Sequence, residues 1–212
     1  MRDKDASGRC VVLGGGPIAE EEIALLRPDD TLWAADAGLL AARRFGLKPD
    51  LCLGDWDSCP QPQGIPDLIT LPTEKDDTDT NYAARLIVER GFGEVLLLGC
   101  IGGRLDHTIA NMNTVLWLTR CGVRCWMVGQ GSAVSALHEG TLRLPRQENC
   151  YFSIFAADGT AEGVTLTGMK YSLEKAKITA SFPIGVSNEI QEDWGEVSVE
   201  KGSLYLIYSK KR

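Results

Sequence analysis

The stretch EVLLLGCIGGRLDH, residues 94–107, joins an apolar run to a glycine-rich turn and then to the start of a helical pattern. The apolar run Glu94–Leu98 is typical of a strand that is buried on both faces. From about Asp106 to Arg120, apolar residues recur at helical spacing and predict a long helix. A buried strand that leads directly into a helix is the building unit of a parallel sheet, so this stretch favours an α/β fold.

The same alternation of strand and helix extends over the first 130 residues. Further strands are predicted at Cys10–Leu13, Thr31–Ala35, Leu51–Leu53, Leu68–Leu71 and Val123–Val128. Helices are predicted at Ile18–Leu26, at Gly38–Phe45, and between a cap at Thr78 or Asp79 and a stop at Gly91. We therefore expect residues 1–130 to form a mostly parallel α/β sheet domain with helices on both faces.

After the sequence GQGS at residues 129–132, the pattern changes to strands and turns alone. Strands are predicted at Ala133–His138, Thr141–Leu144, Tyr151–Phe155, Val164–Thr167, Ala176–Phe182, Glu196–Glu200 and Ser203–Tyr208. Regularly spaced turns between short strands are typical of a small sandwich or barrel, so residues 131–212 are expected to form an all-β domain. A β domain of this size has a marginal core and exposed edges, which favours packing against a second copy of the chain.

Composition excludes several classes of partner. The net charge is −7, and the densest basic run is the last three residues, 210–212, so we expect no nucleic acid partner. No apolar run approaches the roughly 20 residues of a membrane span, and the N-terminal residues are polar, so we expect no membrane partner and no signal peptide. The seven cysteines show no metal-binding spacing and are expected to be reduced thiols, which predicts a cytoplasmic location.

Aspartates follow two of the predicted strands directly. Asp36 comes after the second strand, and Asp55 and Asp57 come after the third. If the backbone stays extended at residues 55–57, both carboxylates point to the same side and raise each other's pKa unless a cation lies between them. Mg²⁺ accepts such carboxylates together with phosphate oxygens. An acidic turn with a helix cap is the alternative reading of this segment.

Two further segments carry charged groups at helix starts. Four acidic residues and Lys75 crowd residues 74–79, where helix capping explains one acid and Lys75 is a candidate phosphate contact. The sequence GGRLDH at 102–107 offers glycines, helix N–H groups and Arg104 to a phosphate, although a simple capped turn has the same sequence. Residues 14–17 match neither the Rossmann nor the Walker pattern.

The carboxyl ends of parallel strands meet at one edge of a sheet, and that edge is where α/β proteins bind ligands. Four predicted strand ends carry acids or glycines. An acidic protein needs a cation to bind an anionic nucleotide. The sequence therefore favours an enzyme that transfers a phosphate-containing group from a magnesium-bound nucleotide.

The blocks DAG at 36–38, PDLCLGDWDS at 49–58, KDDTD at 75–79, GGRLDH at 102–107 and SNE at 187–189 occur in the order found in thiamin pyrophosphokinases. The chain resembles this family over nearly its whole length. The resemblance implies transfer of diphosphate from ATP to the hydroxyl of thiamin, which gives thiamin diphosphate and AMP. It also implies Mg²⁺, an N-terminal α/β nucleotide domain, a C-terminal β-sandwich, and a homodimer with thiamin between the nucleotide domain of one chain and the β domain of the other.

The resemblance further implies roles for individual residues. Catalysis is assigned to Asp55, Asp57 and Asp79, and the metal site to these three with Asp36. Contacts with ATP are assigned to Asp36, Lys75, Asp76, Thr78, Arg104, Asp106 and His107. Contacts with thiamin are assigned to Tyr171, Ser187 and Asn188. The chain departs from the family pattern at Ala37, at Trp56 and at Tyr171, which stands where many members have a tryptophan, and the change at Tyr171 affects how thiamin would stack.

Two other functions remain open. A magnesium-dependent nucleotide phosphohydrolase could use the same aspartates and would release phosphate from ATP without thiamin. A non-catalytic sensor of thiamin or nucleotide would bind its ligand without forming AMP.

Overall fold

The computed structural model describes residues 8–57, 59–62, 64–65, 67–72, 77–182 and 184–211. The chain divides into a first unit that ends at Gln130 and a second that begins at Gly131. No helix in the described part of the chain is long and apolar enough to cross a membrane.

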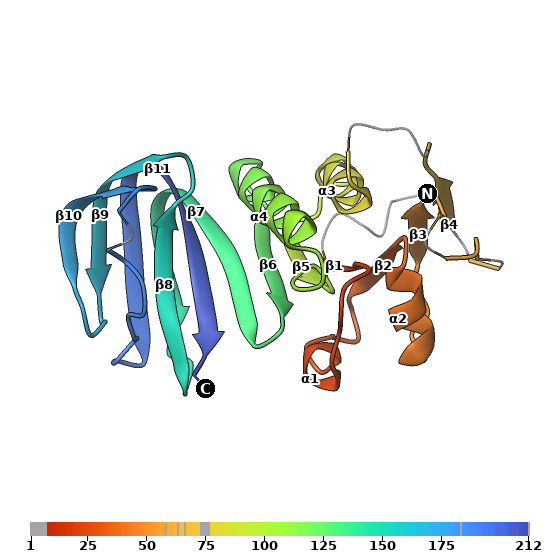
Figure 1. Cartoon of the computed structure of the whole chain (residues 1–212), viewed down its shortest axis with the longest axis horizontal. Coiled ribbons are helices and arrows are strands. Elements are labelled where there is room, and N and C mark those ends of the chain that lie inside the picture. Colours follow the sequence, from red (N-terminus) through yellow and green to blue (C-terminus); the bar gives the residue numbers. More distant parts are fainter. Residues whose placement is uncertain are drawn as a thin grey trace. The chain divides into compact units, whose positions relative to one another are not determined.

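The first unit is a parallel sheet (Figure 1). Its strands are β1 (Arg9–Leu13), β2 (Thr31–Ala35), β3 (Leu51–Gly54), β4 (Asp67–Thr70), β5 (Glu94–Leu98) and β6 (Arg124–Gly129). Within this unit the spatial order is β6-β5-β1-β2-β3-β4, and every pair is parallel. This parallel pairing confirms the prediction of a mostly parallel α/β sheet. Its apolar strands need helices on both faces of the sheet in order to be buried.

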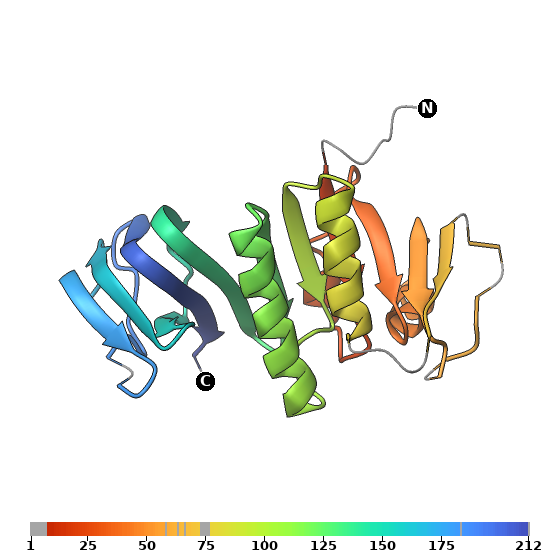
Figure 2. The same ribbon diagram turned by 90° about the horizontal axis from the view of Figure 1, so that it is seen from above.

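Helices cover both faces of this sheet (Figure 2). They are α1 (Glu20–Ile23), α2 (Gly38–Arg44), α3 (Asp79–Glu89) and α4 (Leu105–Arg120). Alternate strand residues point to opposite faces, so Val11, Leu13 and Leu96 pack with Ala42 of α2. Helices α3 and α4 lie together on the other face.

Helix α1 is shorter than the predicted helix Ile18–Leu26. Beyond Ile23 the amide groups of Leu25 and Leu26 donate to the carbonyls three residues earlier, at 3.1 Å each, so the chain tightens into turns. The buried side chain of Glu22 caps the start of the helix by accepting from the amide of Ala19 at 2.6 Å. The helix is therefore one turn long, because the hydrogen bonds after Ile23 no longer follow the α-helical pattern.

The second unit is all β. Its strands are β7 (Ser132–Pro145), β8 (Cys150–Ala156), β9 (Thr160–Thr167), β10 (Leu173–Thr179) and β11 (Trp194–Lys210). The long strand β11 pairs antiparallel with β7, β8 and β9, and β10 pairs with β9. Phe152, Ile154, Leu166 and Leu204 are fully buried between these strands. The prediction of an all-β unit is confirmed.

The division of this unit into seven strands was wrong in two places. The predicted strands Ala133–His138 and Thr141–Leu144 are parts of β7, and Glu196–Glu200 and Ser203–Tyr208 are parts of β11. Positive φ angles of 116° at Gly140 and 97° at Gly202 bend the two strands, and the β7–β11 register shifts between Val199 and Ser203. The bend changes the direction of each strand without ending its pairing.

Gly38 lets helix α2 begin directly against the end of β1. A Cβ added at Gly38 would collide with the carbonyl group of Leu13. This close approach sets the turn at Asp36 and Ala37, which connects β2 to α2. A side chain at residue 38 would push the turn and the helix away from the sheet.

We predict that Gly38→Ala lowers the free energy of unfolding of the first unit by about 3 kcal/mol, because the backbone must shift to relieve the overlap. Urea unfolding followed by tryptophan fluorescence measures the change. Gly93→Ala is the matched control, since a Cβ at Gly93 meets nothing within 4 Å. Equal stability of the two variants would show that the approach of α2 to β1 is not tight.

Candidate active site at the carboxyl edge of the sheet

The carboxyl edge of the parallel sheet holds a polar cleft with a volume of about 570 Å³. The ends of β1, β2, β3 and β5 and the first turns of α3 and α4 line it, as expected from the convergence of parallel strands. The sequence-predicted residues on its wall are Asp36, Asp55, Asp57, Thr78, Asp79, Arg104 and His107. Segments that lie far apart in the sequence thus form one site.

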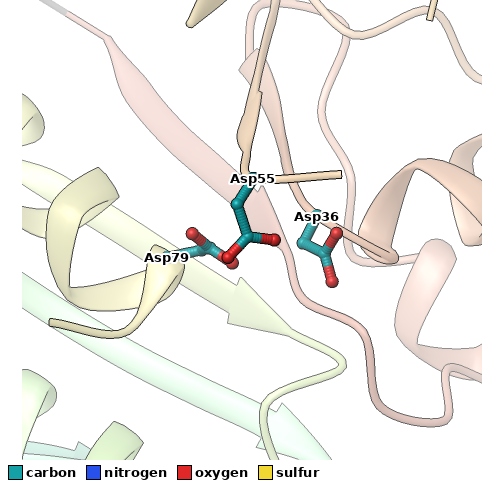
Figure 3. A group of neighbouring side chains, drawn as sticks. All are labelled: Asp36, Asp55 and Asp79. Carbon is teal, nitrogen blue, oxygen red and sulfur yellow. The ribbon is translucent and has the colours of Figure 1, made fainter. Parts of the chain in front are cut away.

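The side chains of three aspartates lie close together in this cleft (Figure 3). Oxygen atoms of Asp36, Asp55 and Asp79 all lie within 4.8 Å of one another, and each residue is half-buried. Asp36 follows β2, Asp55 follows β3 and Asp79 begins α3. We call these three residues the aspartate triad.

The backbone fixes Asp36 in an uncommon conformation. Its φ angle is +45°, and its amide donates to the carbonyl of Leu53 at 2.7 Å, which extends the β2–β3 pairing by one residue. A Cβ on Gly54 would lie 3.0 Å from the Cα of Asp36, so the absence of a side chain there permits the contact. These restraints hold the carboxylate of Asp36 beside that of Asp55.

Helix capping fixes Asp79. The side chain of Thr78 accepts a hydrogen bond from the amide of Asn81 at 3.2 Å, so Thr78 is the N-cap and Asp79 the first helical residue. An acidic residue in the first turn of a helix interacts favourably with the helix dipole. Of the two predicted caps, Thr78 is the one found.

Asp57 lies in the cleft but outside the triad. The chain is not extended between the two aspartates, because Trp56 has a φ angle of +63°. The amide of Asp57 donates to a carboxylate oxygen of Asp55 at 3.2 Å, and the Asp57 side chain is exposed. The condition under which both carboxylates would point the same way is therefore not met, and a metal contact for Asp57 stays a prediction.

The triad fits a small divalent cation by its donor atoms. Among the described residues, oxygen Oδ1 of Asp36 is buried and has no hydrogen-bond partner, although buried polar atoms are normally satisfied. Three carboxylates this close repel one another unless a positive charge lies between them. Carboxylate oxygens are the ligands that Mg²⁺ prefers in proteins.

Of the charged residues at the start of α4, residues 104–107, some line the cleft and one does not. Arg104 donates to the carboxylate of Asp106 at 2.6 and 3.2 Å, and these hydrogen bonds lower the pKa of the Asp106 carboxyl. Arg104 and His107 line the cleft, whereas Asp106 does not. The fork of Arg104 is exposed, so a phosphate that enters the cleft can compete with Asp106 for it.

Asn111 is a cleft residue that the sequence analysis missed. Its side chain is buried and donates to the carbonyl of Cys100 at 2.9 Å, which fixes the turn after β5. Asn111 lies four residues after His107, so the two share one face of α4. Helical spacing from His107 was the signal that could have found it.

The predicted thiamin contacts lie in the second unit. Tyr171 is 60% exposed, and Asn188 is 3% exposed. The amide oxygen of Asn188 accepts from the backbone N–H of Tyr171 at 2.9 Å, and its nitrogen donates to the Tyr171 carbonyl at 2.7 Å. The third predicted thiamin contact, Ser187, is held by its own backbone, because its amide donates to the hydroxyl of Ser153 at 3.0 Å. Asn188 therefore holds the backbone of Tyr171 in place. The ring of Tyr171 is exposed, and the ammonium group of Lys170 lies 5.6 Å from its centroid. Lys75 and Asp76 lie outside the described residues, and their assignment to ATP stays a prediction.

Cys100 lies on the cleft wall and is buried. Burial raises the pKa of its thiol to about 12, although hydrogen bonds from Thr80 and Gly14 oppose the shift. Burial likewise raises the pKa of Cys52 to about 11. Both thiols are therefore protonated near neutral pH.

Comparisons with known proteins match both units. Residues 24–127 match the family model for the thiamin pyrophosphokinase catalytic domain, and residues 139–204 match the model for its vitamin B1 binding domain. A thiamine pyrophosphokinase of Bacillus subtilis (strain 168) is 26% identical over 207 residues, which cover 94% of this chain and 97% of the relative.

Solved structures give the same result. The crystal structure of a thiamine pyrophosphokinase from Bacillus subtilis has a TM-score of 0.88 at 24% identity and covers 96% of this chain and 100% of its own. That of a thiamin pyrophosphokinase from Geobacillus thermodenitrificans has a TM-score of 0.85 at 29% identity and covers 96% of this chain and 98% of its own. Both units therefore have the folds of these proteins.

We predict that the exposed Cys121 reacts with a thiol reagent such as DTNB at pH 8, whereas Cys52 and Cys100 react only after unfolding. Their raised pKa values leave almost no thiolate at that pH, and burial blocks the reagent. Mass spectrometry of labelled peptides after brief exposure identifies the sites. Cys121→Ser should remove the label at residue 121 and leave the other two thiols protected. Labelling of Cys100 as fast as Cys121 would contradict its burial.

Proposed function

We propose that this chain, which belongs to the thiamin pyrophosphokinase family, transfers the terminal diphosphate of ATP as a unit to the hydroxyl oxygen of thiamin. A bond forms between that oxygen and the β-phosphorus of ATP, while the bond from the β-phosphorus to the oxygen bridging it to the α-phosphorus breaks. AMP leaves with the bridging oxygen, and the hydroxyl proton is released. The observation that carries the proposal is the convergence of the aspartate triad in a cleft of about 570 Å³.

Mg²⁺ is the cation that the triad suits. Asp36, Asp55 and Asp79 would hold it, with Asp57 as a further candidate at the cleft wall. Bound there, Mg²⁺ would supply positive charge to the phosphate oxygens and to the leaving AMP oxygen. The unpartnered buried oxygen of Asp36 supports this assignment.

The remaining groups of the cleft position the phosphates. The backbone at Gly15, Gly16 and Gly102–Gly103 can approach a phosphate closely because these residues carry no side chains. Arg104 offers a planar pair of donors. Helix α4 begins at the cleft, and the N-terminus of a helix favours an anion, although the amide of His107 already donates to the carboxylate of Asp106 at 3.0 Å. Diphosphate transfer depends mainly on such in-line positioning and charge neutralisation.

The second unit would bind the acceptor. Thiamin carries a cationic thiazolium ring, and the exposed ring of Tyr171 can stack against a cation. Asn188 holds the backbone of Tyr171 and is thus a positioning residue, and Ser187 precedes it in the same loop. Tyrosine in place of the usual tryptophan keeps an aromatic face for this contact.

A homodimer is part of the proposal. Phe182 and Ile184 are exposed apolar side chains in the same unit, and a second copy of the chain could cover them. Light scattering after size-exclusion chromatography measures the mass in solution. The cytoplasm is the proposed location, supported by the seven free cysteines.

The test of the proposed function is to mix the protein with ATP, Mg²⁺ and thiamin and to measure AMP and thiamin diphosphate. We expect equal amounts of the two products and no reaction after Mg²⁺ is removed by chelation. Phosphate release without thiamin would instead indicate a phosphohydrolase. Ligand binding without AMP would indicate a sensor.

We predict that Asp55→Asn lowers the rate of AMP formation by more than about 100-fold, because it replaces a charged carboxylate ligand of the proposed metal by a neutral amide. Circular dichroism should show that the variant is folded. Asp29→Asn, an exposed aspartate outside the cleft, is the matched control and should retain full activity. Full activity of Asp55→Asn would rule out the metal assignment.

We predict that Tyr171→Ala raises the KM for thiamin about 10-fold, which corresponds to the loss of one cation–π contact. The KM for ATP should not change, because Tyr171 belongs to the second unit. Tyr171→Trp should keep the KM for thiamin near that of the natural chain. A rise in both KM values would indicate that Tyr171 acts on the whole fold rather than on thiamin.

A further inference from the structure

We propose that Cys59 is a positioning residue for the aspartate triad. The inference rests on the proposed function, because it assumes that Asp36, Asp55 and Asp79 hold a divalent cation. Cys59 is 5% exposed and does not line the cleft. It acts through the backbone of Asp36 and has no contact with substrate in this proposal.

The contact is a hydrogen bond from a thiol to a strained peptide. The Sγ of Cys59 donates to the carbonyl oxygen of Asp36 at 3.5 Å, and the amide of Leu39 donates to the same oxygen at 3.1 Å. On its other side, the amide of Asp36 donates to Leu53. Both backbone polar groups of Asp36 are thus restrained.

The restraint matters because Asp36 has a left-handed backbone conformation. A φ angle of +45° is uncommon for a residue other than glycine and persists only where the surroundings enforce it. If the peptide relaxed, the Cα–Cβ bond of Asp36 would rotate and its carboxylate would leave the triad. The thiol of Cys59 opposes that relaxation from beneath the cleft.

Cys59 also ties the turn after β3 to the turn after β2. It packs in one apolar cluster with Ala34, Leu39 and Cys52, against which Trp56 is partly buried. Trp56 stands between Asp55 and Asp57, and its ring nitrogen donates to the hydroxyl of Thr70 at 3.2 Å. One small cluster therefore supports the segments that carry Asp36 and Asp55.

A serine, a valine and an alanine at residue 59 separate hydrogen bonding from packing. Cys59→Ser keeps a donor of similar size. Cys59→Val fills the space without a donor, and Cys59→Ala removes both. Cys52→Ala is the matched control, because Cys52 belongs to the same cluster and no hydrogen bond links it to Asp36.

The experiment measures binding of Mn²⁺, a paramagnetic substitute for Mg²⁺, to the whole chain by electron paramagnetic resonance without ATP. We expect Cys59→Ala and Cys59→Val to weaken Mn²⁺ binding by about 10-fold, the lower end of the effect of losing a group that supports a metal ligand. Cys59→Ser and Cys52→Ala should bind Mn²⁺ like the natural chain. The Mg²⁺ concentration for half-maximal AMP formation should shift in the same order.

The outcomes separate this inference from the proposed function. If the natural chain binds no Mn²⁺ in a manner that depends on Asp55, the proposed metal site fails. If it binds Mn²⁺ and Cys59→Val binds equally well, the inference is overturned, because packing alone then suffices. If Cys59→Ala does not fold, the comparison of Cys59→Ser with Cys59→Val decides the question by itself.

Discussion

The repulsion among three carboxylates is the constraint around which the first unit is arranged. Asp36, Asp55 and Asp79 have oxygens within 4.8 Å of one another, and no local sequence preference would bring them together. The parallel pairing of β2 with β3 and the capped start of α3 hold them there. In the proposed function a cation turns this repulsion into attraction, so cation binding and the stability of this edge are coupled.

Much of this arrangement could be predicted from the sequence, because parallel topology alone decides which residues share an edge. Apolar strands followed by helical patterns give a parallel sheet, and the residues directly after its strands must then meet. Asp36 and Asp55 were predicted together on that ground. The position of Asp57 could not be predicted, because it depends on the positive φ angle of Trp56, which contacts Thr70 fourteen residues away.

In the second unit, too, the local sequence pattern did not predict where the strands begin and end. Glu139 and Gly140 have positive φ angles and read as a turn between two strands, yet β7 continues through them. On both sides of the bend, β7 pairs with β11, and these hydrogen bonds join residues far apart in the sequence. A prediction from neighbouring residues alone cannot include them. Asn188 was predicted as a contact for thiamin, but its buried bonds to Tyr171 could be found only from the fold.

Strand β11 has a consequence for the order in which this chain can fold. It is the shared partner of β7, β8 and β9, and it follows all of them in the sequence. The ribosome makes the chain from its N-terminus, so these three strands are synthesised before β11, their shared partner at residues 194–210. Their strand edges stay unpaired with β11 until then. The six parallel strands that position the aspartates, β1 to β6, are all synthesised before β7 begins. The sheet that carries the aspartates can therefore be complete while the second unit is still exposed to chaperones and to misassociation.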